Sequence, residues 1–87
     1  IINQEPLLTS AQMRAARHAL GLSTFFVASS TGIGIATIKR YEAVNGVPKS
    51  RKNHLETLRA FFESQGIEFV GTPEDRPGIR IGSPKPE

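Results

Sequence analysis

Residues 22–42 read LSTFFVASSTGIGIATIKRYE, and this stretch predicts two short helices joined by a tight turn. The first helix is expected to begin after Ser23, because a serine hydroxyl at the N-cap position accepts an early backbone N–H. Phe26 and Val27 are its expected core contacts. Gly32 is expected to end this helix, since glycine adopts the positive φ of a tight turn at no steric cost.

The second helix of the pair is expected over about residues 35–43. Ile33 is the apolar residue expected beneath the turn, and Ile38 and Tyr41, three positions apart, form the inward pair of the helix. Three other side chains of this helix are expected to point away from this inward pair: Thr37, Lys39 and Arg40. Two short helices with a glycine-containing turn and outward cations on the second are typical of the helix-turn-helix motif.

Further helices are predicted on both sides of this pair. Thr9 and Gln12 form a capping box, in which each side chain reaches a backbone N–H near the helix start. One apolar face follows at helical spacing: Met13, Ala16 and Leu20. A fourth helix is expected over roughly residues 51–65, capped by Ser50 or Asn53. Its apolar stripe is Leu55, Leu58, Phe61 and Phe62.

After residue 66 the apolar period changes from about 3.6 to 2. Residues 67–70 and 79–81 alternate apolar with charged side chains, as half-buried strands do, and turn-forming residues fill positions 71–78. This pattern predicts a two-stranded β-hairpin. Because an isolated hairpin is marginal in water, it is expected to pack on the fourth helix or to pair with another chain.

The chain has 87 residues, which is enough for one domain. The expected fold is mainly α, with a four-helix unit in residues 1–66 and a C-terminal two-stranded β-hairpin in residues 67–82 as an extension of the same domain. Residues 83–87 are expected to form a flexible tail.

Charge is unevenly spread along the chain. The net charge is +3, but residues 11–59 carry eight basic and two acidic residues, whereas residues 60–87 carry three basic and five acidic ones. The central segment therefore has a net charge of +6, which favours a polyanionic partner. Three arginines of this segment are expected to solvate helix faces rather than to contact DNA: Arg14, Arg17 and Arg59.

Composition argues against several classes of function. The chain has no Cys, which removes disulfides, thiolate catalysis and Cys-based zinc sites. His18 and His54 are far apart with no carboxylate at metal-ligand spacing, and no nucleophile–base pair is suggested, so no metal, cofactor or enzymatic activity is expected. No apolar run approaches the roughly 20 residues that span a bilayer, and no signal peptide is visible, so a cytoplasmic location is expected.

The stretch 22–42 resembles the Xre family of helix-turn-helix proteins, the lambda repressor and Cro type. The family pattern combines a Leu-Ser helix start, a buried Ala, a Gly-hydrophobe turn, and a Thr-Ile helix that ends in an aromatic residue and Glu. The residues in register are Ala28, Gly32, Ile33, Thr37, Ile38, Tyr41 and Glu42. The resemblance covers roughly residues 8–65. It implies a lambda-repressor-like fold whose helix over about residues 35–43 enters the major groove of double-stranded DNA.

The resemblance also implies which residues contact DNA. The start of the first helix of the pair meets the DNA backbone, the opening turn of the second meets base edges, and later basic residues reach bases or phosphates. In chain order the expected DNA-binding residues are Ser23, Thr24, Ile35, Ala36, Thr37, Lys39, Arg40, Lys49 and Arg51, with Lys52 beside them.

Some positions depart from the family pattern. Thr24 is shorter than the Gln that often opens its helix, and Phe25 stands where a charged residue is usual. Gly34 replaces the common Ser cap of the recognition helix. Ile35 and Ala36 are apolar, so they can meet only thymine methyl groups or sugar edges. These changes affect base specificity rather than the mode of docking.

The expected function is that of a small bacterial or prophage-type transcriptional regulator at the nucleoid. Because one such domain contacts few base pairs, it is expected to bind a pseudo-palindromic operator as a homodimer. The hairpin or a patch on the fourth helix that includes Phe61 or Phe62 is the expected interface. Two alternatives stay open. One is a DNA-binding antitoxin whose hairpin contacts a second small protein, and the other is a protein-interaction domain without DNA readout.

Overall fold

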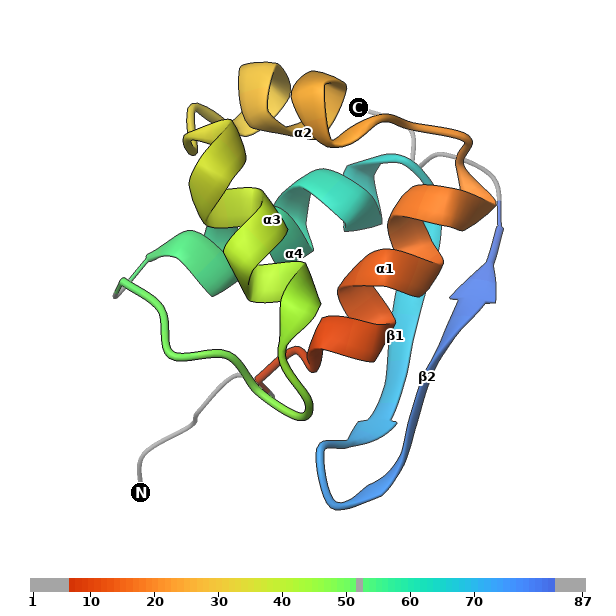
Figure 1. Cartoon of the computed structure of the whole chain (residues 1–87). Helices are drawn as coiled ribbons and strands as arrows, with labels where there is room; N and C mark the ends of the chain where they lie inside the picture. The colour runs from red at the N-terminus through yellow and green to blue at the C-terminus, as the bar shows by residue number, and fades with distance from the viewer. Residues whose placement is uncertain (1–6, 52, 83–87) are drawn as a thin grey trace.

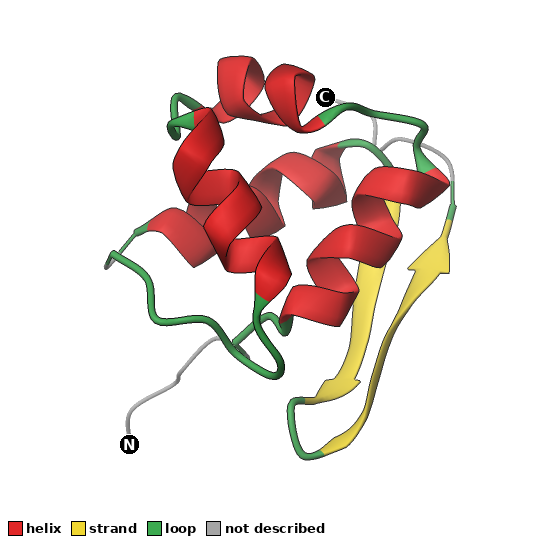
Figure 2. Ribbon diagram, in the orientation of Figure 1, coloured by secondary structure: helices red, strands yellow, loops and turns green. Residues whose placement is uncertain are grey.

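The computed structural model describes residues 7–51 and 53–82, so that Lys52 and the predicted tail, residues 83–87, lie outside the described residues. The elements in chain order are α1 (Ser10–Ala19), α2 (Thr24–Thr31), α3 (Ile35–Ala43), α4 (His54–Ser64), β1 (Ile67–Thr72) and β2 (Asp75–Ile81). The two strands are antiparallel, so the architecture is mainly α with a C-terminal hairpin, as predicted. Figures 1 and 2 show α1 between α3 and the hairpin, with α2 across one end of the molecule.

The start of α1 confirms the predicted capping box. The Thr9 hydroxyl accepts the backbone N–H of Gln12 at 3.1 Å, and the Gln12 side-chain oxygen accepts the backbone N–H of Thr9 at 3.0 Å. Both residues are buried. The reciprocal bonds satisfy two of the N–H groups that a helix start leaves without intrahelical partners.

The predicted turn between α2 and α3 is also confirmed, with one error in the core. Gly32 has φ 79°, and Ile33 is 4% exposed beneath the turn. Val27 is fully buried, but Phe26 is 50% exposed, so the prediction that Phe26 contacts the core is wrong. Three apolar residues follow one another at 25–27, and successive side chains of a helix point about 100° apart, so Val27 faces the core while Phe26 faces outward.

Helix α4 begins at His54, later than the predicted residue 51, and Asn53 precedes it without a side-chain capping bond. The Tyr41 hydroxyl lies at this end of the helix, 2.7 Å from His54 Nδ1, and it accepts the backbone N–H of Arg51 at 3.3 Å. A buried tyrosine therefore joins α3 to the start of α4. The apolar periodicity of the sequence could not predict where α4 begins, because Tyr41, which contacts this end of the helix, belongs to α3.

The apolar stripe of α4 is turned into the core. Phe62 is 1% exposed and Phe61 is half-buried, so the two rings do not form the exposed patch that was expected to pair two copies. The ring of Phe62 lies edge-on to Phe61 at 5.3 Å and to Phe69 at 6.2 Å between centroids. Phe69 belongs to the hairpin and packs on Phe62, so the hairpin covers the aromatic side of α4.

The two strands of the hairpin are longer than predicted and the loop between them is shorter, because backbone pairing continues through residues that carry turn-forming side chains. Phe69 faces Ile79, and pairing resumes with Thr72 opposite Asp75 after an irregularity. Gly71 lies at this irregularity with φ 77°, and a Cβ there would come within 2.2 Å of the Arg76 carbonyl oxygen. Glycine is therefore required at position 71 by a close backbone approach.

The hairpin packs on α4 through β1, as predicted, and also on α1 through β2. Gln12 holds the hairpin against α1 through hydrogen bonds to both strands. Its side-chain amide donates to the carbonyl oxygens of Val70 at 3.1 Å and Gly78 at 3.0 Å, two residues that face each other across the strands. One buried amide thus caps α1 and holds both strands of the hairpin.

The helices of the described segments are short. None of them, in residues 7–51 or 53–82, combines the length and apolar character needed to cross a membrane.

Replacing Gln12 by Ala is expected to lower the free energy of unfolding by about 2–4 kcal/mol, because two partly buried carbonyls and one buried N–H lose their partner. Urea unfolding measures this loss. The control is Gln65→Ala, since Gln65 is exposed at the end of α4 and should change stability by less than about 0.5 kcal/mol. Equal effects of the two substitutions would show that Gln12 does not hold the hairpin.

Candidate nucleic-acid interface

Helix α3 has one face in the core and one in solvent. Ile38 and Tyr41 are 2% and 1% exposed, as predicted. The outward face contains four exposed residues at helical spacing: Ile35, Ala36, Lys39 and Arg40. Thr37 is half-buried beside them. The structure therefore brings four of the five residues predicted on this helix onto one exposed surface.

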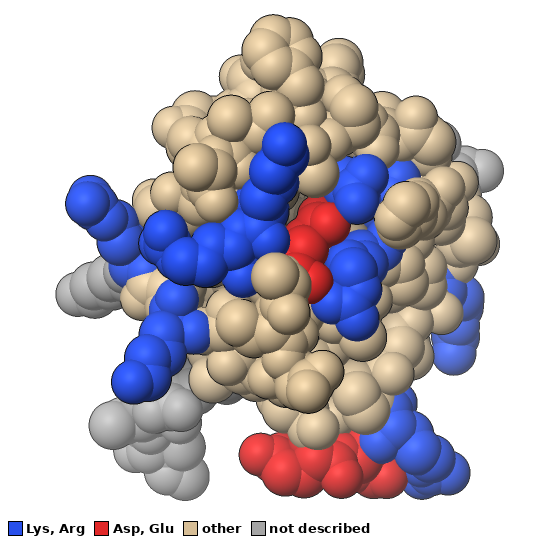
Figure 3. Space-filling model, in the orientation of Figure 1, with Lys and Arg blue, Asp and Glu red and all other residues tan. Residues whose placement is uncertain are grey.

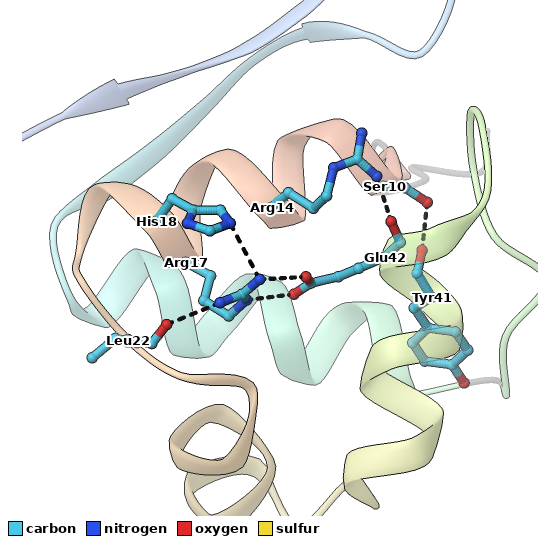
Figure 4. A network of polar contacts seen from close by, with 7 residues as sticks. All are labelled: Ser10, Arg14, Arg17, His18, Leu22, Tyr41 and Glu42. Atoms are coloured by element: carbon cyan, nitrogen blue, oxygen red, sulfur yellow. Dashed lines mark hydrogen bonds and ion pairs between the residues drawn. The ribbon is translucent and has the colours of Figure 1, made fainter.

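The C-terminal end of α3 is held by α1 through polar bonds (Figure 4). Ser10 donates its hydroxyl to the Tyr41 carbonyl, and Arg14 donates to the Glu42 carbonyl. The last carbonyl groups of a helix have no intrahelical partner, so α1 supplies the missing donors. Arg17 completes the contact, since its Nε and Nη2 each donate to a carboxylate oxygen of Glu42 at 2.8 Å.

The Arg17–Glu42 ion pair is largely shielded from water, with 14% and 10% of the two side chains exposed. The hydrogen bond that Arg17 donates to Glu42 raises the pKa of Arg17 above its ordinary value, although burial opposes the charge. Arg17 also donates a hydrogen bond of 3.1 Å to the carbonyl of Leu22, the residue before Ser23, which caps α2. The prediction that Arg14 and Arg17 merely solvate a helix face is wrong, because both side chains hold the end of α3.

This pairing changes the charge of the surface around α3. Glu42 is the one acidic residue between positions 11 and 55, and Arg17 neutralises it. Figure 3 shows Lys and Arg side chains gathered over α3 and the segment that follows it, around a small acidic patch, and a second acidic group at the hairpin tip beside a basic side chain. Within the described residues, no ion pair engages any of four exposed cations: Lys39, Arg40, Lys49 and Arg51.

Lys49 and Arg51 lie in the segment between α3 and α4, which Tyr41 ties to both helices. A hollow of about 490 Å³ separates the end of α3 from this segment, and Arg40 and Lys49 are both part of its lining. The guanidinium of Arg40 is 5.7 Å from the centroid of the Tyr41 ring. Two of the predicted cations thus flank one depression, although they are nine positions apart in sequence.

The two predicted residues on α2 lie at its start. Ser23 is exposed and caps the helix, since its hydroxyl oxygen accepts the backbone N–H of Phe26 at 3.0 Å. Thr24 is the first residue of the helix and is half-buried. As an acceptor in the cap, the Ser23 hydroxyl keeps its own proton available for an external acceptor.

Sequence reasoning missed one surface feature. Phe25 is 67% exposed, as its unusual position suggested, but Phe26 beside it is 50% exposed as well. Helix α2 contains no charged residue. Phe25 and Phe26 therefore form an apolar surface on α2. The one sequence signal for this surface is that Phe26 directly precedes Val27, the residue that faces the core.

Comparisons of the chain with protein-family models, curated proteins and solved structures find no match. In the part of the chain that the structure describes, no three His, Cys, Asp or Glu side chains are grouped so as to hold a metal ion. The surface around α3 offers exposed cations, a hydroxyl at the start of α2, and the methyl groups of Ile35 and Ala36.

The free energy of coupling between Arg17 and Glu42 is expected to be about 1–3 kcal/mol, because either charge is left partly buried when its partner is removed. A double-mutant cycle with Arg17→Met and Glu42→Gln, followed by urea unfolding, measures it. The matched control is the exposed pair Arg80–Glu68, 3.6 Å apart, whose coupling should be below about 1 kcal/mol. A weaker coupling for Arg17–Glu42 than for the control would contradict the role assigned to it.

Proposed function

We propose that this protein binds double-stranded DNA in a sequence-specific manner, as a small bacterial or prophage-type transcriptional regulator of lambda-repressor-like fold. One observation carries the proposal. The exposed face of α3 holds Lys39 and Arg40, the segment after it adds Lys49 and Arg51, and Glu42, the acidic residue of α3, is paired with Arg17. A regulator of this kind acts in the cytoplasm, at the nucleoid.

The dimensions of α3 suit the major groove. An α-helix with side chains is about 10–12 Å across, and the major groove of B-DNA is about 12 Å wide. In this docking mode the opening turn of α3 meets base edges, and Arg40, one turn later, reaches either a guanine or a phosphate. Ser23 and Thr24, at the start of α2, contact the DNA backbone, where exposed N–H groups favour a phosphate.

Lys49 and Arg51 are assigned to the flanking phosphates. Both are exposed, and both belong to a segment that Tyr41 holds against α3 and α4. Their contribution is electrostatic and independent of sequence, because neutralised phosphates release counterions. Binding should therefore weaken steeply with salt.

Two copies are proposed to bind a pseudo-palindromic operator with half-sites about one helical turn apart, since one domain contacts few base pairs. The buried Phe62 is excluded from the interface, and Ile81, 64% exposed at the end of β2, is the apolar residue that the hairpin offers. Sedimentation of the protein at high micromolar concentration, with and without operator, tests the dimer. A monomer under both conditions would refute it.

The exposed Phe25 and Phe26 favour a second candidate function, which is contact with another protein through α2. Aromatic side chains are enriched at protein–protein interfaces relative to the rest of the surface. The two functions differ in one cheap observation. A protein-interaction domain without DNA readout would retain no duplex from a random pool at low salt, whereas a DNA-binding domain would.

Arg40→Ala is expected to weaken binding to the operator selected from a random duplex pool by about 1–3 kcal/mol. Lys49→Ala should weaken binding to all duplexes alike and reduce the slope of log affinity against log salt by about 1. Fluorescence anisotropy with labelled duplexes measures both.

Arg80→Ala is the matched control, because Arg80 is an exposed arginine outside the proposed DNA contacts and its side chain points to the opposite face of β2 from Ile81. Its affinity for the operator should equal that of the unmodified protein. The proposed interface is wrong if Arg80→Ala weakens binding as much as Arg40→Ala, or if neither Arg40→Ala nor Lys49→Ala has an effect.

A further inference from the structure

The opening turn of α3 exposes methyl groups where a base-reading helix commonly exposes amides or guanidinium groups. Ile35 is 37% exposed, and Ala36 is exposed beside it. Thr37, the nearest hydroxyl, is half-buried. The first polar groups with long reach, Lys39 and Arg40, come one turn later. This turn is therefore an apolar surface on an otherwise cationic face.

The position before this turn carries no side chain, and the fold does not require that. Gly34 is the N-cap of α3 with φ −60° and ψ 145°, a conformation open to any residue. A Cβ there would have only Thr37 Oγ1 within 4 Å, at 3.9 Å. Ser, Asn or Asp would cap the helix better. Glycine instead leaves the backbone bare, which suits the close approach of a ligand.

The surroundings of Ile35 and Ala36 identify the chemistry of the occupant. Lys39 and Arg40 share their face, so the occupant is a polyanion, and it must also present apolar groups to the opening turn. In the major groove of DNA the thymine C5-methyl is the group that apolar side chains contact. RNA lacks this methyl group, and its deep, narrow major groove does not admit side chains to its bases.

We propose that Ile35 and Ala36 read thymine C5-methyl groups, so that each operator half-site carries thymine where the opening turn of α3 faces the bases. This inference rests on the proposed function, because it requires α3 to lie in the major groove. Gly34 allows the turn to approach the bases closely, and Arg40 reads or grips the DNA one turn further along. Specificity then comes from methyl contacts at one end of the interface and from a guanidinium at the other.

Deoxyuridine substitution tests the proposal, because uracil differs from thymine only by the C5-methyl group. Each thymine of the selected operator is replaced in turn, and the dissociation constant is measured by fluorescence anisotropy. One or two adjacent positions in each half-site should weaken binding by about fourfold, the contribution of one buried methyl group. Deoxyuridine elsewhere should have no effect.

Two variants assign the effect to Ile35. Ile35→Ala should abolish the preference for thymine over uracil at one of the sensitive positions, because the contacting methyl groups are gone. Leu7→Ala is the matched control, since Leu7 is an exposed aliphatic residue that precedes α1 and belongs to neither proposed interface, and it should keep the full preference. Gly34→Ser should leave the melting temperature unchanged or raised and weaken operator binding, because its side chain blocks the approach.

The outcomes separate this inference from the proposed function. Failure of the chain to retain any duplex from a random pool at low salt would overturn the DNA-binding proposal itself. If the chain prefers its selected operator but every deoxyuridine duplex binds equally well, DNA binding stands and thymine readout is wrong. Thymine readout is also overturned if Ile35→Ala keeps the full preference for thymine over uracil.

Discussion

The contact between α1 and the end of α3 is the constraint on which the rest of the structure depends. Ser10, Arg14 and Arg17 are spaced four and three positions apart, which places them on one face of α1. They satisfy the terminal carbonyls and the carboxylate of α3. Because these donors fix the C-terminal end of α3, its opposite end and outer face are presented to solvent in a defined orientation. Gln12, on another side of α1, holds the hairpin.

The same contact shapes the electrostatics of the proposed interface. An isolated Glu42 would place a negative charge beside the cations of α3, but the bidentate bond to Arg17 turns it inward and cancels it. The other described acidic residues lie on α4 or on the hairpin. The net charge of the chain is only +3, but its basic and acidic side chains are therefore strongly separated. The basic surface surrounds α3, and the other described acidic groups lie on elements that the proposed docking mode leaves away from DNA.

Local patterns predicted the fold well where the partners are close in sequence. The Thr9–Gln12 capping box, the positive φ of Gly32 and the buried pair on α3 all follow from short-range chemistry. Sequence reasoning failed where partners are distant. The amide of Gln12 meets carbonyls 58 and 66 positions away, and Arg17 meets Glu42 25 positions away, so no periodicity could indicate them. The exposed face of α3 could be predicted from its helical spacing alone, whereas the binding of DNA to this face remains a proposal.

The central claim, that the outer face of α3 binds duplex DNA, is tested most directly by chemical-shift mapping. A ¹⁵N-labelled chain is titrated with the selected operator duplex, and backbone amide shifts are followed residue by residue. We expect the largest changes at residues 23–24, 34–40 and 44–51, and smaller changes at the proposed dimer contact around Ile81. Changes centred on the hairpin or on α4, or no changes at low salt, would contradict the account.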